Sequence, residues 1–378
     1  MDSSQKLTNT DVKKLNKNRI FRLIYNSDKI SRQEIADQLG LSLPTVNQNL
    51  KMLMEDELIE YVGNFTSTGG RRAQAITINN NARKAISVNI KADYINVDVV
   101  GLKGQIIYSM AVKAHFSKSS AYIEKLTDAV RHAVDYVGAD ADDILGVGIT
   151  VPGILDDEKQ ILISAPPLKA KNYDFTRLIS AIDYPVVVMN DARAEAYADH
   201  WFNGKPEDEK IYIMLGEGVG GAYINASAIR NGVHNHGGEF GHMVIHPGGK
   251  QCLCGKKGCF EAYVSEKVLS SELDMTLDNF FELAAQGNKN NSNVLDEYMD
   301  NLALGINNIY TMMDCDIVLG GTVAPYLKQY DNSIKERLVN DYSFDTDADY
   351  LRISDGGGRK SGLGAALSFV ARFIDGVE

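Results

Sequence analysis

Short apolar segments that end in glycine or in a polar residue recur along residues 81–378 of this 378-residue chain. The runs ILGVGITVPG (144–153), YPVVVMND (184–191) and CDIVLGGTVAPYL (315–327) are short and almost continuously apolar, as in strands buried on both faces. The segment 120–137, which precedes them, repeats its apolar residues with a helical period. This alternation of buried strands and amphipathic helices predicts an α/β body.

Two other stretches of the body predict strands joined by glycine turns. Residues 85–112 indicate two or three strands with a turn at 102–104, and residues 210–224 indicate a strand, a glycine turn and a second strand. The glycine cluster 216–221 therefore does not match a dinucleotide-binding fingerprint, which opens a helix. A plain tight turn and a hairpin that lets a ligand approach the backbone are both compatible with this cluster.

Residues 1–80 have a different pattern, which is typical of a helix-turn-helix. The sequence SRQE at 31–34 is a capping box that starts a short helix, and Gly40 suits the left-handed conformation that ends one. Ser42 then caps a second helix that has Pro44 in its first turn. Helical spacing in this segment and in the one before residue 26 predicts an apolar face formed by Leu15, Ile20, Leu23, Ile24, Val46, Leu50 and Leu53.

A strand, a loop and a second strand are predicted between residues 58 and 79, which completes a winged helix-turn-helix. The loop carries Arg71 and Arg72 beside two glycines, a combination suited to phosphate or to a narrow minor groove. Asparagine and glutamine on the second helix are able to read adenine in the major groove. We therefore expect DNA contacts from Ser42, Pro44, Thr45, Asn47, Gln48, Lys51, Arg71 and Arg72.

The charge of the chain is uneven. Residues 1–80 hold 11 Lys and Arg against 9 Asp and Glu, and the rest holds 28 against 41, out of 39 and 50 in the whole chain. A mildly basic head on an acidic body permits a local DNA contact and keeps the body away from phosphate. Lys13, Lys14 and Lys17 are equally consistent with a solvated helix face and with phosphate contacts. Two helices and a turn also occur in small helical domains that bind no DNA.

Three of the four cysteines lie within residues 252–259, close to two histidines. Three thiolates and one imidazole make the closed shell of a structural zinc site. A disulfide framework is disfavoured because the cysteines are clustered and no secretory signal precedes them. The fourth cysteine, Cys315, lies in an apolar segment and is expected to be a buried small hydrophobe. The candidate ligands are Cys252, Cys254 and Cys259, with either His242 or His246.

Asn190 and Asp191 directly follow an apolar strand. A carboxylate at the carboxyl end of a buried strand is a common position for a base or for a ligand of a hydroxyl group. An N-cap for the helix predicted after them is an equally good interpretation.

The chain resembles the ROK family, which groups sugar-responsive repressors with sugar kinases. The resemblance rests on Gly-Glu-Phe-Gly-His at 238–242 and on Cys-x-Cys-Gly-x-x-Gly-Cys-x-Glu at 252–261, with further motifs in matching order along nearly the whole chain. The winged head matches the repressor branch, which includes the xylose and N-acetylglucosamine repressors. The resemblance implies an actin-like, hexokinase-type body with two α/β lobes and a cleft between them.

The resemblance also implies roles for individual residues. It selects His242 rather than His246 as the fourth zinc ligand. Asp191 matches the residue that serves as the base in the kinase members. The implied sugar-cleft residues are Asn190, Asp191, Glu239, His242 and Glu261.

The sequence departs from the family pattern at three places that would affect the binding of phosphate or of sugar. Family kinases begin the body with an Asp-x-Gly-Gly-Thr phosphate loop, whereas residues 89–93 read Asn-Ile-Lys-Ala-Asp. Side chains in place of the glycines block backbone approach to phosphate, and Asp93 repels it. Glu217 adds a negative charge in the second loop, where kinases usually have threonine. Pro167 stands where an asparagine often follows Ala-Pro, so we expect an altered pocket or a different sugar.

We therefore predict a cytoplasmic transcriptional repressor with a structural Zn²⁺ and no phosphoryl transfer, in which Asp191 is a vestigial base. Its partners would be operator DNA, a sugar or sugar derivative, and further copies of itself in a homodimer or tetramer. No apolar run is long enough to span a membrane. The alternatives are an ATP-dependent sugar kinase with a regulatory DNA-binding head and a repressor controlled by a protein partner.

The predicted domain organisation has three parts. The winged head covers residues 1–80. A small lobe covers 81–190, to which a carboxyl-terminal helix at 361–378 returns. A large lobe at 191–360 carries the zinc motif and the dimerisation surface.

Overall fold

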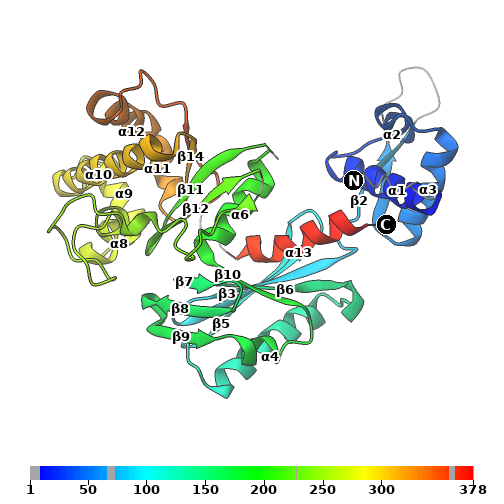
Figure 1. The fold of residues 1–378 in the computed structure, drawn as a ribbon, viewed down its shortest axis with the longest axis horizontal. Coiled ribbons are helices and arrows are strands. Elements are labelled where there is room, and N and C mark those ends of the chain that lie inside the picture. The colour runs from blue at the N-terminus through cyan, green and yellow to red at the C-terminus, as the bar shows by residue number, and fades with distance from the viewer. Residues whose placement is uncertain (1–8, 66–72, 206, 227, 357–361, 378) are drawn as a thin grey trace, which may run out of the picture.

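The computed structural model describes residues 9–65, 73–205, 207–226, 228–356 and 362–377. Its elements form an N-terminal head, at the right of Figure 1, and a larger body built on two five-stranded sheets. The carboxyl-terminal helix reaches from the body to the head, so segments far apart in the sequence lie side by side.

The head is a winged helix-turn-helix, as its sequence predicts. Ser31 and Glu34 form the capping box of the second helix, and Gly40 ends that helix with φ of 63°. Ser42 caps the third helix by accepting a hydrogen bond from the Thr45 amide. The elements are α1 (Asn9–Tyr25), α2 (Arg32–Leu39), α3 (Leu43–Glu55) and the antiparallel strands β1 (Ile59–Asn64) and β2 (Gln74–Ile78).

The packing of α1 differs from the prediction at two positions. Ile20 and Phe21 are buried, but Leu15 is 49% exposed. Leu15 lies five residues before Ile20, which is roughly 140° around a helix, so Phe21 completes the buried stripe in its place. Lys17 is neither solvated nor available to phosphate, because it is buried and pairs with Asp56 at 2.8 Å.

The first sheet of the body has the strand order β10-β6-β3-β4-β5. The three strands β10, β6 and β3 are parallel, whereas β3, β4 and β5 form an antiparallel meander. Helix α4 covers one face and helix α13 covers the other. The bounds are β3 (Lys84–Ile90), β4 (Tyr94–Gly101), β5 (Ile106–Lys113), α4 (Ser120–Tyr136), β6 (Ile144–Val151), β10 (Val186–Asn190) and α13 (Leu363–Gly376).

The second sheet has the order β13-β12-β11-β14-β15. Helix α6 packs on one face through Ala196, and helix α10 packs on the other through Leu302 and Ile306. The bounds are α6 (Asp191–Asn203), β11 (Glu209–Leu215), β12 (Val219–Asn225), β13 (Ala228–Ile229), α9 (Leu277–Ala285), α10 (Lys289–Met313), β14 (Asp316–Gly320) and β15 (Leu351–Ile353).

The remaining elements are short. Strands β7 (Ile154–Asp156), β8 (Ile161–Ala165) and β9 (Ala170–Asp174) form a small antiparallel sheet beside the first one. The short helices are α5 (Thr176–Ile179), α7 (Glu261–Val264), α8 (Glu266–Leu269), α11 (Ala324–Leu327) and α12 (Asp331–Arg337).

The alternation of strands and helices predicted for the body is confirmed. The glycine cluster 216–221 forms the hairpin between β11 and β12. Cys315 is only partly buried, contrary to the prediction, because it lies in the connection between α10 and β14 rather than in the strand. The domain boundaries at residues 80 and 190 stay predictions. In the part of the chain that the structure describes, no helix combines the length and the apolar character needed to cross a membrane.

Candidate functional site

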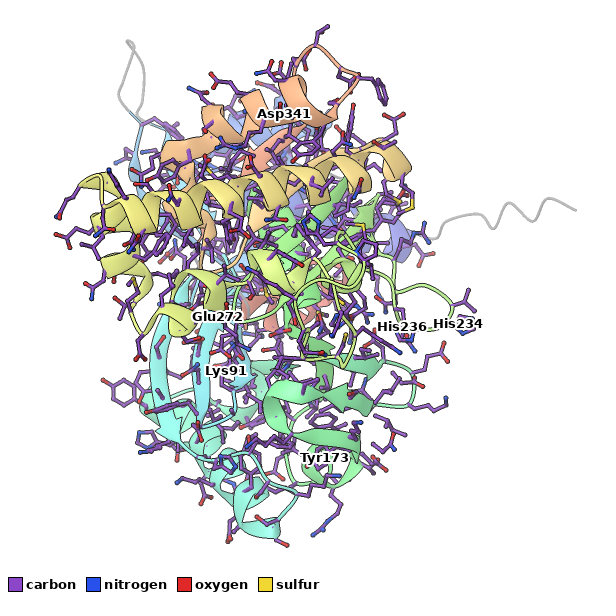
Figure 2. All side chains as sticks on the ribbon, turned by 90° about the vertical axis from the view of Figure 1, so that its left-hand side faces the viewer. Lys91, Tyr173, His234, His236, Glu272 and Asp341 are labelled. Atoms are coloured by element: carbon purple, nitrogen blue, oxygen red, sulfur yellow. The ribbon has the colours of Figure 1, made fainter. Side chains whose placement is uncertain are left out.

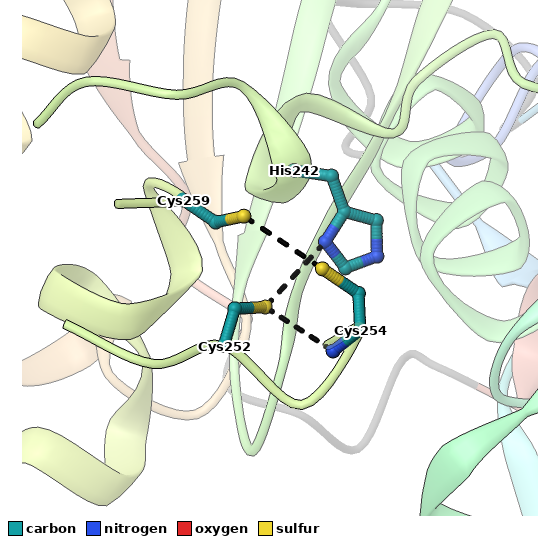
Figure 3. A group of neighbouring side chains, drawn as sticks. All are labelled: His242, Cys252, Cys254 and Cys259. Atoms are coloured by element: carbon teal, nitrogen blue, oxygen red, sulfur yellow. Dashed lines mark hydrogen bonds between the residues drawn. The ribbon is translucent and has the colours of Figure 1, made fainter. Parts of the chain in front are cut away.

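One imidazole and three thiols gather in the loops between β13 and α7 (Figure 3). Each residue contributes one ligand atom, and these four atoms all lie within 4.8 Å of one another. The histidine belongs to a 3₁₀ turn, Phe240–His242, and the cysteines belong to the glycine-rich loop that follows it. The four residues are His242, Cys252, Cys254 and Cys259.

The spacing of these atoms fits a tetrahedral zinc ion. Metal bonds of about 2.3 Å to sulfur and about 2.0 Å to nitrogen place two sulfurs about 3.8 Å apart and a sulfur and a nitrogen about 3.5 Å apart. The Sγ atoms of Cys254 and Cys259 are 3.7 Å apart, and Cys252 Sγ is 3.8 Å from Nδ1 of His242. Three thiolates and one imidazole would complete a protein shell, which is the structural rather than the catalytic type of zinc site.

The second histidine of this region, His246, lies outside the cluster. Its Nε2 is 2.6 Å from Oδ1 of Asn301 on α10, and its ring packs edge-on against Tyr263. His242 instead turns Nδ1 toward the sulfurs and Nε2 toward Glu239, whose Oε2 is 3.9 Å away. His242 therefore links the thiol cluster to a carboxylate outside it.

The strand β10 delivers Asn190 and Asp191 to the start of α6. Asn190 caps the helix, because its Oδ1 accepts the Arg193 amide at 3.0 Å. Asp191 is the first helical residue and is 6% exposed. Burial raises the pKa of the Asp191 carboxyl, and Lys91 opposes that shift with Nζ at 3.9 Å from Oδ2. The side chain of Asn190, and not that of Asp191, caps the helix. The carboxylate of Asp191 lies beside Lys91.

Glu239 and Glu261 lie before and after the cysteine loop in the sequence, and Glu239 interacts with the charge of Asp191. Burial raises the pKa of the Glu239 carboxyl, the charges of His242 and Arg193 lower it, and the charge of Asp191 raises it again. Glu261 begins α7, where its Oε2 accepts the Val219 amide at 3.0 Å and its Oε1 lies 3.6 Å from Cys252 Sγ. Glu261 thus joins the cysteine loop to the glycine hairpin.

Two cations of this region were not predicted from the sequence. Lys91 lies near the junction between the two halves of the body in Figure 2. Arg193 is 3% exposed, and its guanidinium donates to Asp157 Oδ2 at 3.0 Å and to the Asn235 carbonyl at 2.9 Å. Asp157 follows β7 and Asn235 follows β13, so Arg193 holds together two loops from different sheets. The one sequence feature that could have indicated this role of Arg193 is that an arginine stands in an alanine-rich helix.

Glu195 is a buried carboxyl group that the sequence analysis also missed. It is 1% exposed, and its Oε1 accepts hydrogen bonds from the Tyr212 hydroxyl at 3.0 Å and from the Gly321 amide at 2.8 Å. Burial raises the pKa of Glu195 to about 7, although both hydrogen bonds lower it. Through these bonds α6 is attached to β11 and to the turn after β14.

The residues that depart from the kinase pattern lie at the end of β3 and in three separate turns, and two of them, Lys91 and Glu217, interact with Asp191. Residues 91–93 close the β3–β4 hairpin, in which Lys91 faces Asp191 and Asp93 Oδ1 lies 2.8 Å from Nδ1 of His115. Glu217 is exposed at the tip of the β11–β12 hairpin, and its charge raises the pKa of Asp191. Pro167 is exposed in the 3₁₀ turn Pro166–Leu168.

A second candidate site is the exposed face of α3 in the head. Val46 and Leu50 face the core, and the opposite side of the helix is polar. Arg32, which was not predicted, begins α2 and places Nη1 3.4 Å from Oδ1 of Asn47, so it adds a cation to this face. The predicted contacts Arg71 and Arg72 lie outside the described residues. The other predicted contacts are exposed, or half-buried in the case of Thr45: Ser42, Pro44, Thr45, Asn47, Gln48 and Lys51.

Comparison with known proteins gives two family matches. The model of the ROK family matches residues 85–370, and the model described as winged helix-turn-helix DNA-binding matches residues 15–60. The chain is 29% identical to the xylose repressor of Bacillus subtilis over 319 residues, which is 82% of either chain. It is 25% identical to the N-acetylglucosamine repressor of Escherichia coli O6:H1 over 264 residues, which is 69% of this chain and 65% of that one.

Solved structures show the same architecture. A ROK family transcriptional regulator, described as a homolog of the Escherichia coli MLC protein, matches with a TM-score of 0.74 at 21% identity and covers 97% of this chain and 100% of its own. A ROK family glucokinase from Streptomyces griseus, solved with glucose and AMPPNP, matches with a TM-score of 0.63 at 25% identity. It covers 75% of this chain and 98% of its own. The actin-like, hexokinase-type fold expected for the body and the winged head before it are both confirmed.

Proposed function

The chain belongs to the ROK family, and from that premise we propose that it is a transcriptional repressor whose affinity for operator DNA is set by a sugar bound in the body. One observation carries this proposal. A winged helix-turn-helix is joined to a ROK body in which the Lys91 ammonium lies 3.9 Å from the Asp191 carboxylate. A side-chain cation thus stands in the turn where family kinases present glycines to phosphate.

The turn at 89–93 supports binding without phosphoryl transfer. A general base needs a free carboxylate beside the sugar hydroxyl and a phosphoryl donor in line with it. Here Lys91 pairs with Asp191, and Asp93 and Glu217 add negative charge nearby. Like charges repel a triphosphate, so Asp191 acts as a hydrogen-bond acceptor for the sugar and not as a base.

The carboxylates around Asp191 suit a ligand rich in hydroxyl groups. Asp191, Glu239 and Glu261 are acceptors, and hydroxyl groups donate strong hydrogen bonds to ionised carboxylates. Asn190 and His242 complete the proposed sugar contacts. The names of two relatives, a xylose repressor and an N-acetylglucosamine repressor, support a pentose or hexose derivative as the effector.

Zinc has a structural role in this proposal. His242, Cys252, Cys254 and Cys259 would hold the ion and would brace the loop that runs from Glu239 to Glu261. The bound ion supplies rigidity and positive charge to the three thiolates. Two heads are needed to read two operator half-sites, so we propose a homodimer as the DNA-binding unit.

The test measures operator affinity with and without sugar. Operator duplexes are selected from random DNA with the wild-type protein, and D-xylose and N-acetylglucosamine are titrated in gel shifts. We expect one sugar to change the operator Kd and Glu239→Ala to abolish that change while sugar-free operator binding persists. The matched control, Glu282→Ala on α9, should respond like the wild type. A failure to select any duplex would overturn the repressor assignment, and a wild type that responds to neither sugar would contradict control by these two sugars.

A further inference from the structure

Helix α6 runs from the proposed sugar site to the DNA-binding head. Asp191 is its first residue, and Trp201 lies in its last turn. The ring of Trp201 meets the ring of Tyr25, the last residue of α1, edge-on with centroids 6.2 Å apart. Figure 1 shows the head beside this end of the body. One helix of 13 residues, roughly 20 Å long, therefore separates the cleft from the head.

Side-chain bonds attach α6 to the second sheet at two levels. Glu195 accepts hydrogen bonds from Tyr212 on β11 and from the Gly321 amide after β14. One turn later, Asp199 accepts from Ser354 Oγ at 2.7 Å and from Arg352 Nη2 at 2.6 Å, at the end of β15. Because both carboxylates are buried and bonded, α6 is expected to move as one body with the second sheet.

The head is attached mainly to the other half of the body. Asn18 Nδ2 donates to the Ile374 carbonyl at 2.9 Å, and Arg22 pairs with Asp375 at 2.5 Å. The ring of Phe21 packs edge-on against Phe373. These partners belong to α13, which covers the first sheet. The side-chain bonds of the head therefore go to the side of the first sheet, whereas those of α6 go to the second sheet, and α6 and α13 pack against each other between them.

Tyr25 is the residue at which these two attachments meet. Its hydroxyl donates to the Leu102 carbonyl at 2.7 Å, in the turn between β4 and β5 of the first sheet. Its ring contacts Trp201 at the end of α6. A rotation of one sheet against the other would displace Trp201 relative to Leu102, and Tyr25 touches both.

We propose that the Tyr25–Trp201 contact transmits the relative position of the two halves of the body to the DNA-binding head. This inference rests on the proposed function, because it assumes that a sugar beside Asp191 changes the angle between the sheets. Packed interfaces switch between discrete arrangements, so a small rotation would repack the aromatic contact and turn α1 with the helices that pack on it. By linkage, operator binding must act back on the cleft by the same factor.

The experiment uses full-length protein, the selected operator, and D-xylose and N-acetylglucosamine as probes. Tyr25→Phe removes the hydrogen bond to Leu102 and keeps the ring. Trp201→Phe replaces the indole by a smaller ring and so reduces the aromatic contact with Tyr25. The control is Tyr136→Phe, which removes a tyrosine hydroxyl from a part of the body outside the proposed contact. Tyr136 lies on α4, is 67% exposed and stacks on Tyr108 of β5. Calorimetry measures sugar affinity, and gel shifts measure operator Kd with and without sugar.

We expect the sugar to change the operator Kd of the wild type and of Tyr136→Phe by at least about fivefold. Both relay variants should bind sugar as the wild type does and bind sugar-free operator within about twofold of it. They should lose most of the sugar-dependent change. A full sugar effect in both variants would overturn the relay and leave the repressor assignment standing.

A second readout does not depend on the identity of the sugar. Trp201 is the single tryptophan of the chain, so its emission reports this contact directly. Operator DNA alone should shift that emission in the wild type and in Tyr136→Phe, and the shift should be diminished in Tyr25→Phe. Emission that operator leaves unchanged in the wild type would refute the relay even if the gel shifts show regulation by sugar.

Discussion

At the scale of single residues, the proposed sugar site gathers carboxyl groups that burial would tend to neutralise. Burial raises the pKa values of Asp191 and Glu239, and nearby cations oppose both shifts. Lys91 opposes the shift of the Asp191 pKa, and Arg193 opposes the shift of the Glu239 pKa. Charges paired in this way remain acceptors for hydroxyl groups, which is what a sugar site requires.

Glu195 gives a pH-dependent prediction at the same scale. Burial raises its pKa from 4.5 to about 7, so the native state holds this proton more tightly than the unfolded state does. The free energy of unfolding should therefore fall as pH rises from about 4.5 to about 7, by roughly 3 kcal/mol from this group. Glu195→Gln keeps an acceptor oxygen and removes the titration.

The measurement is urea unfolding at pH 5 and pH 8. Relative to the wild type, Glu195→Gln should gain unfolding free energy between these two pH values. The exposed Glu336→Gln on α12 should track the wild type. Parallel pH profiles for Glu195→Gln and the wild type would show that burial does not perturb this carboxyl group.

The cysteines give a second prediction about single residues. Cys254→Ser leaves three of four ligands, so the bound zinc should fall from about one ion per chain to a small fraction after dialysis against a chelator. The melting temperature should fall as well, since metal binding adds to folding free energy. Metal content by mass spectrometry and thermal unfolding check both effects. Cys315→Ser is the matched control, and an equal loss of zinc in it, or no zinc in the wild type, would contradict the assignment.

At the scale of elements, α3 is the part of the head that is built to read DNA. Its buried stripe of Val46, Leu50 and Leu53 fixes the helix against α1 and α2, and the amide side chains of Asn47 and Gln48 are exposed. Arg32 at the start of α2 adds a phosphate-binding cation next to Asn47. We therefore propose that α3 supplies base contacts and that Arg32 of α2 supplies a phosphate contact beside them.

Removing one amide should weaken operator binding without unfolding the head. Gln48→Ala is expected to raise the operator Kd by roughly 5–150-fold, because a bidentate base contact contributes about 1–3 kcal/mol. Fluorescence anisotropy with the selected operator measures the change. Gln286→Ala, at the end of α9, is the control for loss of an exposed amide. An operator Kd for Gln48→Ala equal to that of the wild type would exclude Gln48 from the base contacts.

At the scale of the whole molecule, two sheets and a head meet at α6 and α13. Helix α6 packs on the second sheet and against α13, and α13 packs on the first sheet and against α1. A kinase needs this body to bring a sugar to a nucleotide, whereas a repressor needs it to bring a sugar signal to DNA. We propose that the turn at residues 89–93, with Lys91 in place of a glycine, suits this chain to the second use.

The whole chain should therefore transfer no phosphoryl group. Incubation with Mg-ATP and D-glucose, D-xylose or N-acetylglucosamine should produce no ADP above the level seen without protein, because side chains in the 89–93 turn block the backbone approach to phosphate that glycines allow. A coupled spectrophotometric assay measures ADP. Sugar-dependent ADP formation that Asp191→Asn abolishes would favour the kinase alternative.

The sequence by itself predicted the features that depend on neighbours along the chain. The capping box at 31–34, the turn at Gly40 and the buried residues of α3 follow from helical periodicity and from the conformations that individual residues allow. The three cysteines lie within eight residues, so their meeting was also predictable. The periodicity was less reliable in the middle of α1, where Leu15 is exposed.

Only the tertiary structure decided which distant residues meet. It paired Lys91 with Asp191 and Arg193 with Asp157, and it buried Lys17 against Asp56. It also turned His242 rather than His246 toward the thiols, the choice that the family resemblance had implied but that the spacing of the residues had left open. These pairs join residues up to 100 positions apart on different elements. Local patterns specify which face of a helix or strand is buried, but not which partner that face receives. That choice depends on how the sheets pack, because a buried charge or imidazole is stable only where packing supplies its counterpart.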